Sequence, residues 1–251
     1  MTEPNPATAH PHDKVFLSAH WSNLLMLQWR VPEELLRPHL GPGIELDTFE
    51  GATYVSVVGL RFDRTKLLGI GIPFHQSFTE VNLRFYVRRE APDGIRRGVV
   101  FISELVPRFW IATIARLFYN EKYRAIPMRH AISNESSSYR WMYGWRAGGR
   151  EHRIEASAVG NPTAMAAGSR EEFIAEHYWG YSKQRDGSVF EYRVRHPSWK
   201  VWSLTDLACD WSPSETYGSA LGEILRSQPE FAFVADGSDV TVSWGSKVAV
   251  S

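Results

Sequence analysis

Hydrophobic and polar residues alternate with a two-residue period over several stretches of the chain, which is the pattern of half-buried β-strands. Turn-forming pairs such as Gly148-Gly149, Asp186-Gly187 and Asp236-Gly237 separate many of these stretches and favour hairpin connections. Many strands separated by short turns are typical of an antiparallel sheet that closes or folds on itself. The predicted strands cover residues 54–62, 78–88, 98–106, 138–147, 152–159, 189–196 and 240–248.

Helical signals are fewer and shorter than strand signals. Ser169 followed three residues later by Glu172 has the spacing of a capping box, and it predicts a helix that reaches about residue 178. Since strands dominate, the predicted class is α+β. The other predicted helices cover residues 32–40, 108–119 and 215–226.

Length and composition predict an ordinary globular chain. Its 251 residues fit one large domain, and 43% hydrophobic with 22% charged residues is a foldable composition. No change of composition along the chain forces a division. We therefore expect a flexible lead over residues 1–14 and a single domain over residues 15–251.

The predicted strand over residues 78–88 carries polar side chains on one face. Glu80, Asn82 and Arg84 alternate with apolar residues, so a carboxylate, an amide and a guanidinium stand about 6.6 Å apart in a row. The alternation leaves two interpretations open. The row faces solvent, or it faces the interior of a closed sheet or cleft. In the second case Glu80 is an acid or base and Arg84 anchors an anion.

Aromatic residues are unusually frequent, with ten Trp, ten Tyr and thirteen Phe. Tyr139, Trp141, Tyr143 and Trp145 share one face of a predicted strand. Such a ladder is usually sheet core, and a platform for a ligand is the second interpretation.

The balance of charge limits the classes of partner. Basic and acidic residues number 28 each, so the net charge is zero, and nothing favours nonspecific binding to nucleic acid or to an anionic membrane. No apolar run is long enough to span a membrane, and the N-terminus lacks the pattern of a signal peptide. We expect a cytoplasmic protein with no nucleic-acid or membrane partner, and homo-oligomer formation stays open.

Motifs for cofactors and metals are missing from the sequence. There is no phosphate-binding loop, no dinucleotide-binding glycine pattern and no His-Glu-x-x-His. The single cysteine, Cys209, excludes an intrachain disulfide and a cysteine-rich zinc site, and it is expected to be an inert small hydrophobe. We therefore predict neither a cofactor nor a metal site.

Several segments, taken in order, resemble the uncharacterised YqjF-like family of bacterial proteins. The resemblance runs from about residue 21 to residue 204. The segments that carry it by their order and spacing include Trp29-Arg30-Val31-Pro32, Phe78-Thr79-Glu80-Val81-Asn82-Leu83-Arg84-Phe85-Tyr86-Val87, Glu172-Phe173 with Glu176-His177-Tyr178, and Val194-Arg195-His196-Pro197 with Trp199.

That family is similar in fold to acetoacetate decarboxylase. The resemblance implies a strongly bent antiparallel sheet that forms a cone or double-layer barrel, with a few helices packed outside and a ligand cavity inside. It also favours the inward orientation of Glu80, Asn82 and Arg84. The decarboxylase uses a Schiff-base lysine beside a second lysine, and this chain has Tyr123 and Arg124 at the matching positions. The resemblance therefore does not carry the Schiff-base reaction over to this chain.

The first hypothesis is a small-molecule site inside the sheet, which binds or processes a small polar or anionic compound, such as a carboxylate or carbonyl compound. Glu80 is the candidate catalytic residue, and the candidate ligand-binding residues are Arg84, Asn82, Tyr86, Tyr123 and Arg124. Whether the chain is an enzyme stays open; if it is, a lyase- or hydrolase-like acid/base reaction is expected. The alternatives are a ligand sensor or carrier without turnover, and an interaction module whose polar rows are surface.

Overall fold

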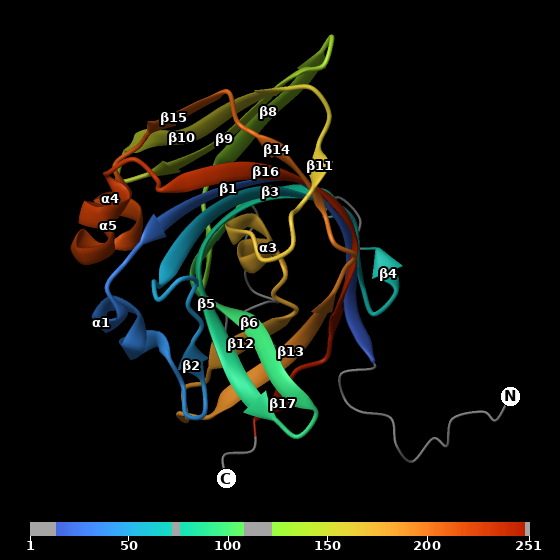
Figure 1. Ribbon diagram of the computed structural model, residues 1–251, viewed down its shortest axis with the longest axis vertical. Coiled ribbons are helices and arrows are strands. Elements are labelled where there is room, and N and C mark those ends of the chain that lie inside the picture. The colour runs from blue at the N-terminus through green and yellow to red at the C-terminus, as the bar shows by residue number, and fades with distance from the viewer. Residues whose placement is uncertain (1–13, 72–75, 108–121, 249–251) are drawn as a thin grey trace, which may run out of the picture.

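The computed structural model describes residues 14–71, 76–107 and 122–248. Two sheets dominate them, a large sheet that curves strongly and a smaller sheet that lies against its outer side (Figure 1). The expected strand-rich α+β class with a strongly bent sheet is confirmed. No helix of this described part is long and apolar enough to cross a membrane.

The large sheet closes on itself. Its hydrogen-bonded order is β11-β14-β16-β1-β3-β5-β6-β12-β13-β17, and a further pairing of β13 with β16 turns the middle of this path into a ring. Most neighbours are antiparallel, but β12 and β7 each pair with β6 in parallel. The strands are β1 (Val15–Arg30), β2 (Glu45–Leu46), β3 (Tyr54–Leu67), β4 (Ile70–Gly71), β5 (Phe78–Ala91), β6 (Gly94–Val106), β7 (Tyr123–Ala125), β11 (Thr163–Ala164), β12 (Trp179–Lys183), β13 (Val189–Arg195), β14 (Lys200–Ser203), β16 (Phe231–Ser243) and β17 (Ser246–Lys247).

The smaller sheet forms a second layer. Its order is β15-β10-β9-β8, with β8 (Met128–Glu135), β9 (Ser138–Ala147), β10 (Arg150–Val159) and β15 (Asp206–Asp210). Tyr143 of β9 packs closely on Gly59 of β3. A Cβ atom at Gly59 would lie 2.5 Å from the Tyr143 ring, so only glycine leaves room for this contact between the layers.

The helices are short. They are α1 (Glu33–Leu36) with a following 3₁₀ turn (Arg37–His39), α3 (Arg170–Ala175), α4 (Pro213–Tyr217) and α5 (Ser219–Leu225). The expected cap of α3 is present, because the Ser169 hydroxyl accepts from the backbone N–H of Glu172 at 3.2 Å. In contrast to the expected outer packing, α3 packs against the interior of the ring, where Phe173 contacts Tyr86 of β5 (Figure 1). Its apolar side is buried there.

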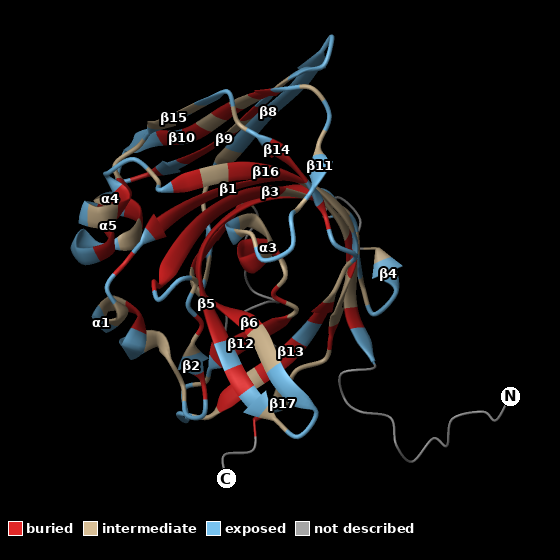
Figure 2. Ribbon diagram, viewed as in Figure 1, coloured by how far each residue is buried: buried red, intermediate tan, exposed pale blue. Residues whose placement is uncertain are grey.

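Strand β5 is buried on both faces from Phe78 to Val87 (Figure 2). Val81, Leu83 and Phe85 belong to the core between the two layers, together with Trp141 and Tyr143 of the smaller sheet. The other face points into the ring. The solvent-facing interpretation of the polar row is therefore wrong, because a double layer leaves neither face of this strand in water.

Several elements differ from their predicted bounds. Strand β1 was not predicted, because breaks in its register near Ser18 and Ser22 interrupt the alternation. The predicted strand over 240–248 is instead the end of β16 followed by β17. The predicted helix over 215–226 is divided at Gly218, whose φ is 86°. The predicted helix over 108–119 and nearly all of the predicted flexible lead lie outside the described residues.

Candidate functional site

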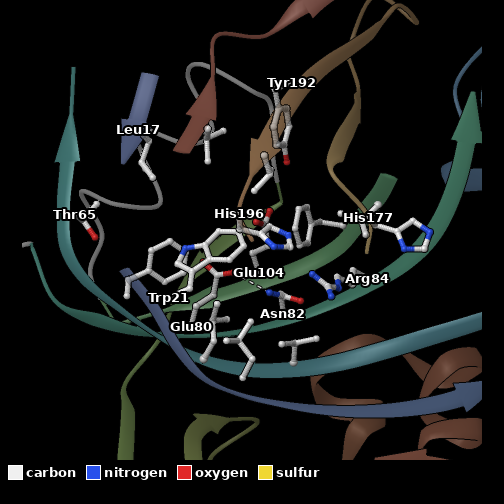
Figure 3. A pocket seen from close by; sticks show the side chains of 18 of the residues that line it. Leu17, Trp21, Thr65, Glu80, Asn82, Arg84, Glu104, His177, Tyr192 and His196 are labelled. Carbon is white, nitrogen blue, oxygen red and sulfur yellow. Dashed lines mark hydrogen bonds between the residues drawn. The ribbon is translucent and has the colours of Figure 1, made fainter. Parts of the chain in front are cut away.

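The ring encloses a cavity of about 160 Å³. Figure 3 shows its polar side chains in the middle and at one end, with Trp21, Leu17 and Thr65 at the other. The polar lining comes from neighbouring strands and from the segment after α3. It includes Glu80, Asn82, Arg84, Glu104, Tyr123 and His177, and Thr65, Tyr192 and His196 are further polar lining residues.

Strand pairing brings these polar groups together. Alternation on β5 directs Glu80, Asn82 and Arg84 to the same face, and this face is the inner one. Asn82 pairs with Glu104 on β6, which pairs in turn with Tyr123 on β7. An amide, a carboxyl and a phenol thus lie side by side across three strands.

Glu80 is a carboxyl in a buried, hydrogen-bonded setting. It is 2% exposed, and it accepts hydrogen bonds from Asn82 Nδ2 at 2.9 Å and from the Tyr123 hydroxyl at 3.2 Å. Burial raises the pKa of Glu80 to about 7, although both hydrogen bonds and the charge of Arg84 lower it. A carboxyl with this pKa can give or take a proton near neutral pH.

Arg84 is a buried cation. Its side chain is 9% exposed, no salt bridge or hydrogen bond engages its guanidinium among the described residues, and its Nε is fully buried. The ring of Tyr86 lies 5.8 Å from the guanidinium carbon. Because an unpaired buried charge is costly, this position favours an anionic group in the cavity.

His177 is held in one orientation behind the guanidinium. Its Nε2 lies 3.2 Å from Asp47 Oδ2, which also accepts from Arg97 Nε at 2.7 Å. Burial lowers the pKa of His177 to about 4; the bond to Asp47 opposes this shift, and the charges of Arg97 and Arg84 add to it. The ring is therefore neutral near pH 7. Its Nε2 carries the proton that Asp47 accepts, and Nδ1 is left as an acceptor.

The other end of the cavity is built from aromatic rings. Phe62 and Phe78 stack with centroids 4.5 Å apart, and Trp21 packs edge-on against Phe62 at 5.4 Å. His196 stacks on Trp199 at 4.1 Å. These rings close the sides of the cavity with apolar surface.

The structure gathers four of the six predicted site residues in this cavity. They are Glu80, Asn82, Arg84 and Tyr123. The two others lie outside its lining. Tyr86 shares the inner face of β5 but packs behind the site, where its hydroxyl bonds Ser56 Oγ at 2.5 Å. Arg124 points to the far side of β7 and donates to the Thr216 carbonyl at 2.9 Å, because successive side chains of a strand alternate in direction.

Three important groups were missed or given another role. Glu104 and Trp21 were not singled out, and His177 was noted only as part of a family motif. Glu104 is the only charged residue of the predicted strand over 98–106, and this isolation in a mostly apolar strand could have marked it. No local sequence pattern could have assigned Trp21 to the cavity, because the segment that forms β1 was not predicted as a strand.

The aromatic ladder of β9 is core, as its first interpretation predicted. Trp141, Tyr143 and Trp145 are each at most 2% exposed and do not line the cavity. The Trp141 indole donates to Asn23 Oδ1 at 2.9 Å, and the Tyr143 hydroxyl donates to the Asn23 carbonyl at 2.6 Å. The ladder thus joins the two layers.

Two further groups bear on the chemistry. Burial raises the pKa of Cys209 to about 11, so this thiol is a poor nucleophile at neutral pH. Among residues 14–71, 76–107 and 122–248, no three His, Cys, Asp or Glu side chains gather in a group that could hold a metal ion. The site therefore has to be understood from its carboxyls, its guanidinium and its imidazoles.

Comparison with known proteins agrees with this architecture. The chain matches the DUF2071 family, described as an uncharacterized conserved protein, over residues 18–239. It is 24% identical over 224 residues to the uncharacterized protein YqjF of Bacillus subtilis (strain 168), a match that covers 88% of this chain and 87% of that protein. The expected resemblance to YqjF is confirmed.

Solved structures show the same fold at low identity. Acetoacetate decarboxylase from Legionella pneumophila subsp. pneumophila str. Philadelphia 1 has a TM-score of 0.65 at 12% identity, covering 99% of this chain and 93% of that one. The enduracididine biosynthesis enzyme MppR, solved with HEPES buffer bound, has a TM-score of 0.63 at 13% identity, covering 99% of each chain. An acetoacetate decarboxylase-like enzyme from Sphingomonas wittichii RW1 has a TM-score of 0.62 at 13% identity, covering 98% of each.

Proposed function

The chain belongs to the DUF2071 family of uncharacterized conserved proteins, and from this premise we propose that it binds a small carboxylate or carbonyl compound inside the ring. Arg84 anchors the anionic group of the ligand, with Asn82 beside it. Glu80 exchanges a proton with the ligand. The observation that carries the proposal is the buried guanidinium of Arg84, for which the described residues supply neither a salt bridge nor a hydrogen bond.

A carboxylate suits this guanidinium better than a neutral ligand does. Arginine presents its N–H groups in a planar fork that matches the two oxygens of a carboxylate. Such a ligand compensates a charge that folding has removed from water, and the cavity has room for it beside Glu80 and Asn82. Binding of the carboxylate thus offsets the desolvation cost of the buried guanidinium, and this contributes to the affinity.

Glu80 is suited to proton transfer because its pKa lies near 7. The charge of Arg84 lowers this pKa, so a bound carboxylate that neutralises Arg84 allows the pKa of Glu80 to rise. Ligand binding should therefore favour the protonated form of Glu80. In the bound state Glu80 is a general acid, and it becomes a base after the proton has been passed on.

We infer that any reaction proceeds without a Schiff-base lysine. No lysine occurs among the described residues that line the cavity. Lys122, the nearest candidate in the sequence, has its ammonium 3.1 Å from Nδ1 of His39. A neighbour's ligand also supports the ligand class, because MppR has been solved in complex with pyruvate, a small carboxylate that carries a carbonyl.

The first experiment tests the anchor. Straight-chain carboxylates of two to eight carbons are titrated calorimetrically into the full chain and into Arg84→Met. Arg88→Met is the matched control, since Arg88 lies on the same strand with a half-exposed side chain. We expect binding that is lost in Arg84→Met and kept in Arg88→Met. Equal binding to all three proteins, or no binding to any of them, would contradict the proposal.

A second experiment separates an enzyme from a carrier. The protein is incubated with a pool of small carboxylates and keto acids, and both retention and consumption are measured. An enzyme consumes a compound, and Glu80→Gln stops the consumption while retention continues. Retention without consumption in the unaltered chain assigns a sensor or carrier, in which Glu80 has no catalytic role.

A further inference from the structure

The cavity is polar at one end and mainly apolar at the other. Glu80, Asn82 and Arg84 are 2%, 3% and 9% exposed. Leu17, Trp21 and Leu67 line the opposite end and are only partly buried. Figure 3 shows Leu17 and Trp21 at one side and Arg84 at the other. The row of Glu80, Asn82 and Arg84 is thus more deeply buried than Leu17, Trp21 and Leu67.

Strand register sets the order of groups along the cavity. Trp21 on β1 pairs with Phe62 on β3, and Phe62 pairs with Phe78 on β5. Phe78 precedes Arg84 by six residues, which is about 20 Å of extended strand. Glu80 lies between these two levels. A ligand anchored at Arg84 therefore meets Glu80 first and the aromatic rings beyond it.

The apolar end carries no charged group among the described lining residues. Its walls include Phe16, Leu17, Trp21, Phe62, Leu67 and Phe78, and the polar side chains beside them are Thr65, Tyr192 and His196. A cavity of about 160 Å³ is close to the roughly 150 Å³ that accommodates a benzene molecule. A ligand with only two or three carbons would leave these rings facing empty space or water.

We propose that the ligand is an amphipathic monocarboxylate, with its carboxylate at Arg84 and an apolar body of six or more carbons that extends past Glu80 towards Trp21, Phe62 and Phe78. This inference rests on the proposed function and narrows its substrate class. It makes Leu17 and Trp21 specificity-determining, because they contact the apolar body and not the charged group. It also accounts for aromatic residues that the acid/base groups leave unexplained.

The test compares chain length with the charged group held constant. Acetate, butanoate, hexanoate and phenylacetate are titrated into the full chain, with hexanamide as the uncharged comparison. Each buried methylene is worth about 0.8 kcal/mol, or about a fourfold gain in affinity. We expect hexanoate and phenylacetate to bind at least about tenfold more tightly than acetate, and hexanamide to bind weakly.

A bulkier side chain at the apolar end gives a second test, with ligand affinity as the measurement. Leu17→Trp places a larger ring at the apolar end and should reduce hexanoate affinity about tenfold while acetate affinity changes less than about twofold. Val15→Trp is the matched control, because Val15 lies on the same strand, is 43% exposed and does not line the cavity. Thermal unfolding of both variants verifies that they fold.

The outcomes distinguish this inference from the proposed function. Equal affinity for acetate and hexanoate overturns the amphipathic ligand and leaves the anchor at Arg84 intact. Tight binding of hexanamide, or hexanoate binding that survives Arg84→Met, overturns the anchor itself. If Leu17→Trp weakens acetate and hexanoate equally, the body does not lie at this end and the inference fails.

Discussion

The two faces of β5 are both buried, yet only the inner face carries polar side chains whose atoms need hydrogen-bond partners. Val81, Leu83 and Phe85 on the outer face pack into the core between the layers and have no polar group to satisfy. Asn82 and Arg84 on the inner face have polar atoms that find no partner among the described residues. The outer face stabilises the fold, and the inner face retains groups that a ligand can satisfy.

The largest expected effect tests the outer face. Leu83→Ala removes most of a side chain with no exposed surface, and we expect the free energy of unfolding to fall by about 2–5 kcal/mol. Urea denaturation measures this loss. Under native conditions the variant should bind carboxylates as the unaltered chain does, since Leu83 points away from the cavity. A loss below about 1 kcal/mol would mean that the layers are loosely packed here.

The next effect tests the carboxyl of the inner face through pH. Burial raises the pKa of Glu80 to about 7. The buried carboxyl therefore does not destabilise the fold at a pH well below its pKa in the unfolded chain, and it destabilises the fold increasingly as the pH rises towards 7. We expect Glu80→Gln to gain about 3 kcal/mol in unfolding free energy, relative to the unaltered chain, between pH 4 and pH 8. Chemical denaturation at both pH values measures this difference.

Glu45→Gln is the control for the pH series, because Glu45 is an exposed partner of Arg88 on the same sheet. Its unfolding free energy is measured at the same two pH values. A Glu80→Gln difference that stays constant from pH 4 to pH 8 would show that Glu80 titrates at an ordinary pKa.

A smaller effect tests the unpaired cation. Arg84→Met keeps much of the length of the side chain and removes the charge, and we expect a gain in stability of about 1 kcal/mol. Carboxylate binding should be lost in the same variant. A gain in stability combined with a loss of binding is characteristic of a functional group, whereas a loss of both properties would assign Arg84 to the fold.

The smallest effect tests a single hydrogen bond. The Tyr123 hydroxyl donates to Glu80 and lowers the pKa of that carboxyl. We expect Tyr123→Phe to raise the midpoint of the Glu80 titration by about half a pH unit to one pH unit. NMR of the isotope-labelled Glu80 carboxyl measures this midpoint. Tyr217→Phe is the matched control, since the buried hydroxyl of Tyr217 has no partner among the described residues and lies outside the cavity. Equal shifts in both variants would count against the bond.

Much of the fold could be predicted from local patterns. The alternation over residues 138–147 coincides with β9, and the Ser169 cap of α3 follows from the Ser-x-x-Glu spacing. Strand β1 could not be found in this way, because its register breaks near Ser18 and Ser22 and it is buried on both faces over much of its length. Alternation is lost over residues 24–27, where both faces of β1 carry apolar side chains, whereas β5 keeps it because its inner face carries polar residues.

The candidate site was only partly accessible to such reasoning. Glu80, Asn82 and Arg84 were found together because one strand carries all three. Glu104 and His177 come from other segments, and only sheet pairing and the docking of α3 bring them to the same cavity. Tyr86 and Arg124 were included because they neighbour cavity residues. Tyr86 shares the inner face but bonds Ser56, and Arg124 points away from the cavity because it follows Tyr123 directly on the same strand.

By itself, the sequence determined the strand-rich class, the row of carboxyl, amide and guanidinium on one strand, and the capped helix, because each depends on residues a few positions apart. The tertiary structure alone decided that this row faces the interior. Both faces of β5 meet other elements only when the sheet closes on itself and the second layer covers it. Burial then changes the chemistry of the row, because removal from water raises the pKa of Glu80 and leaves the Nε of Arg84 without a hydrogen-bond partner among the described residues.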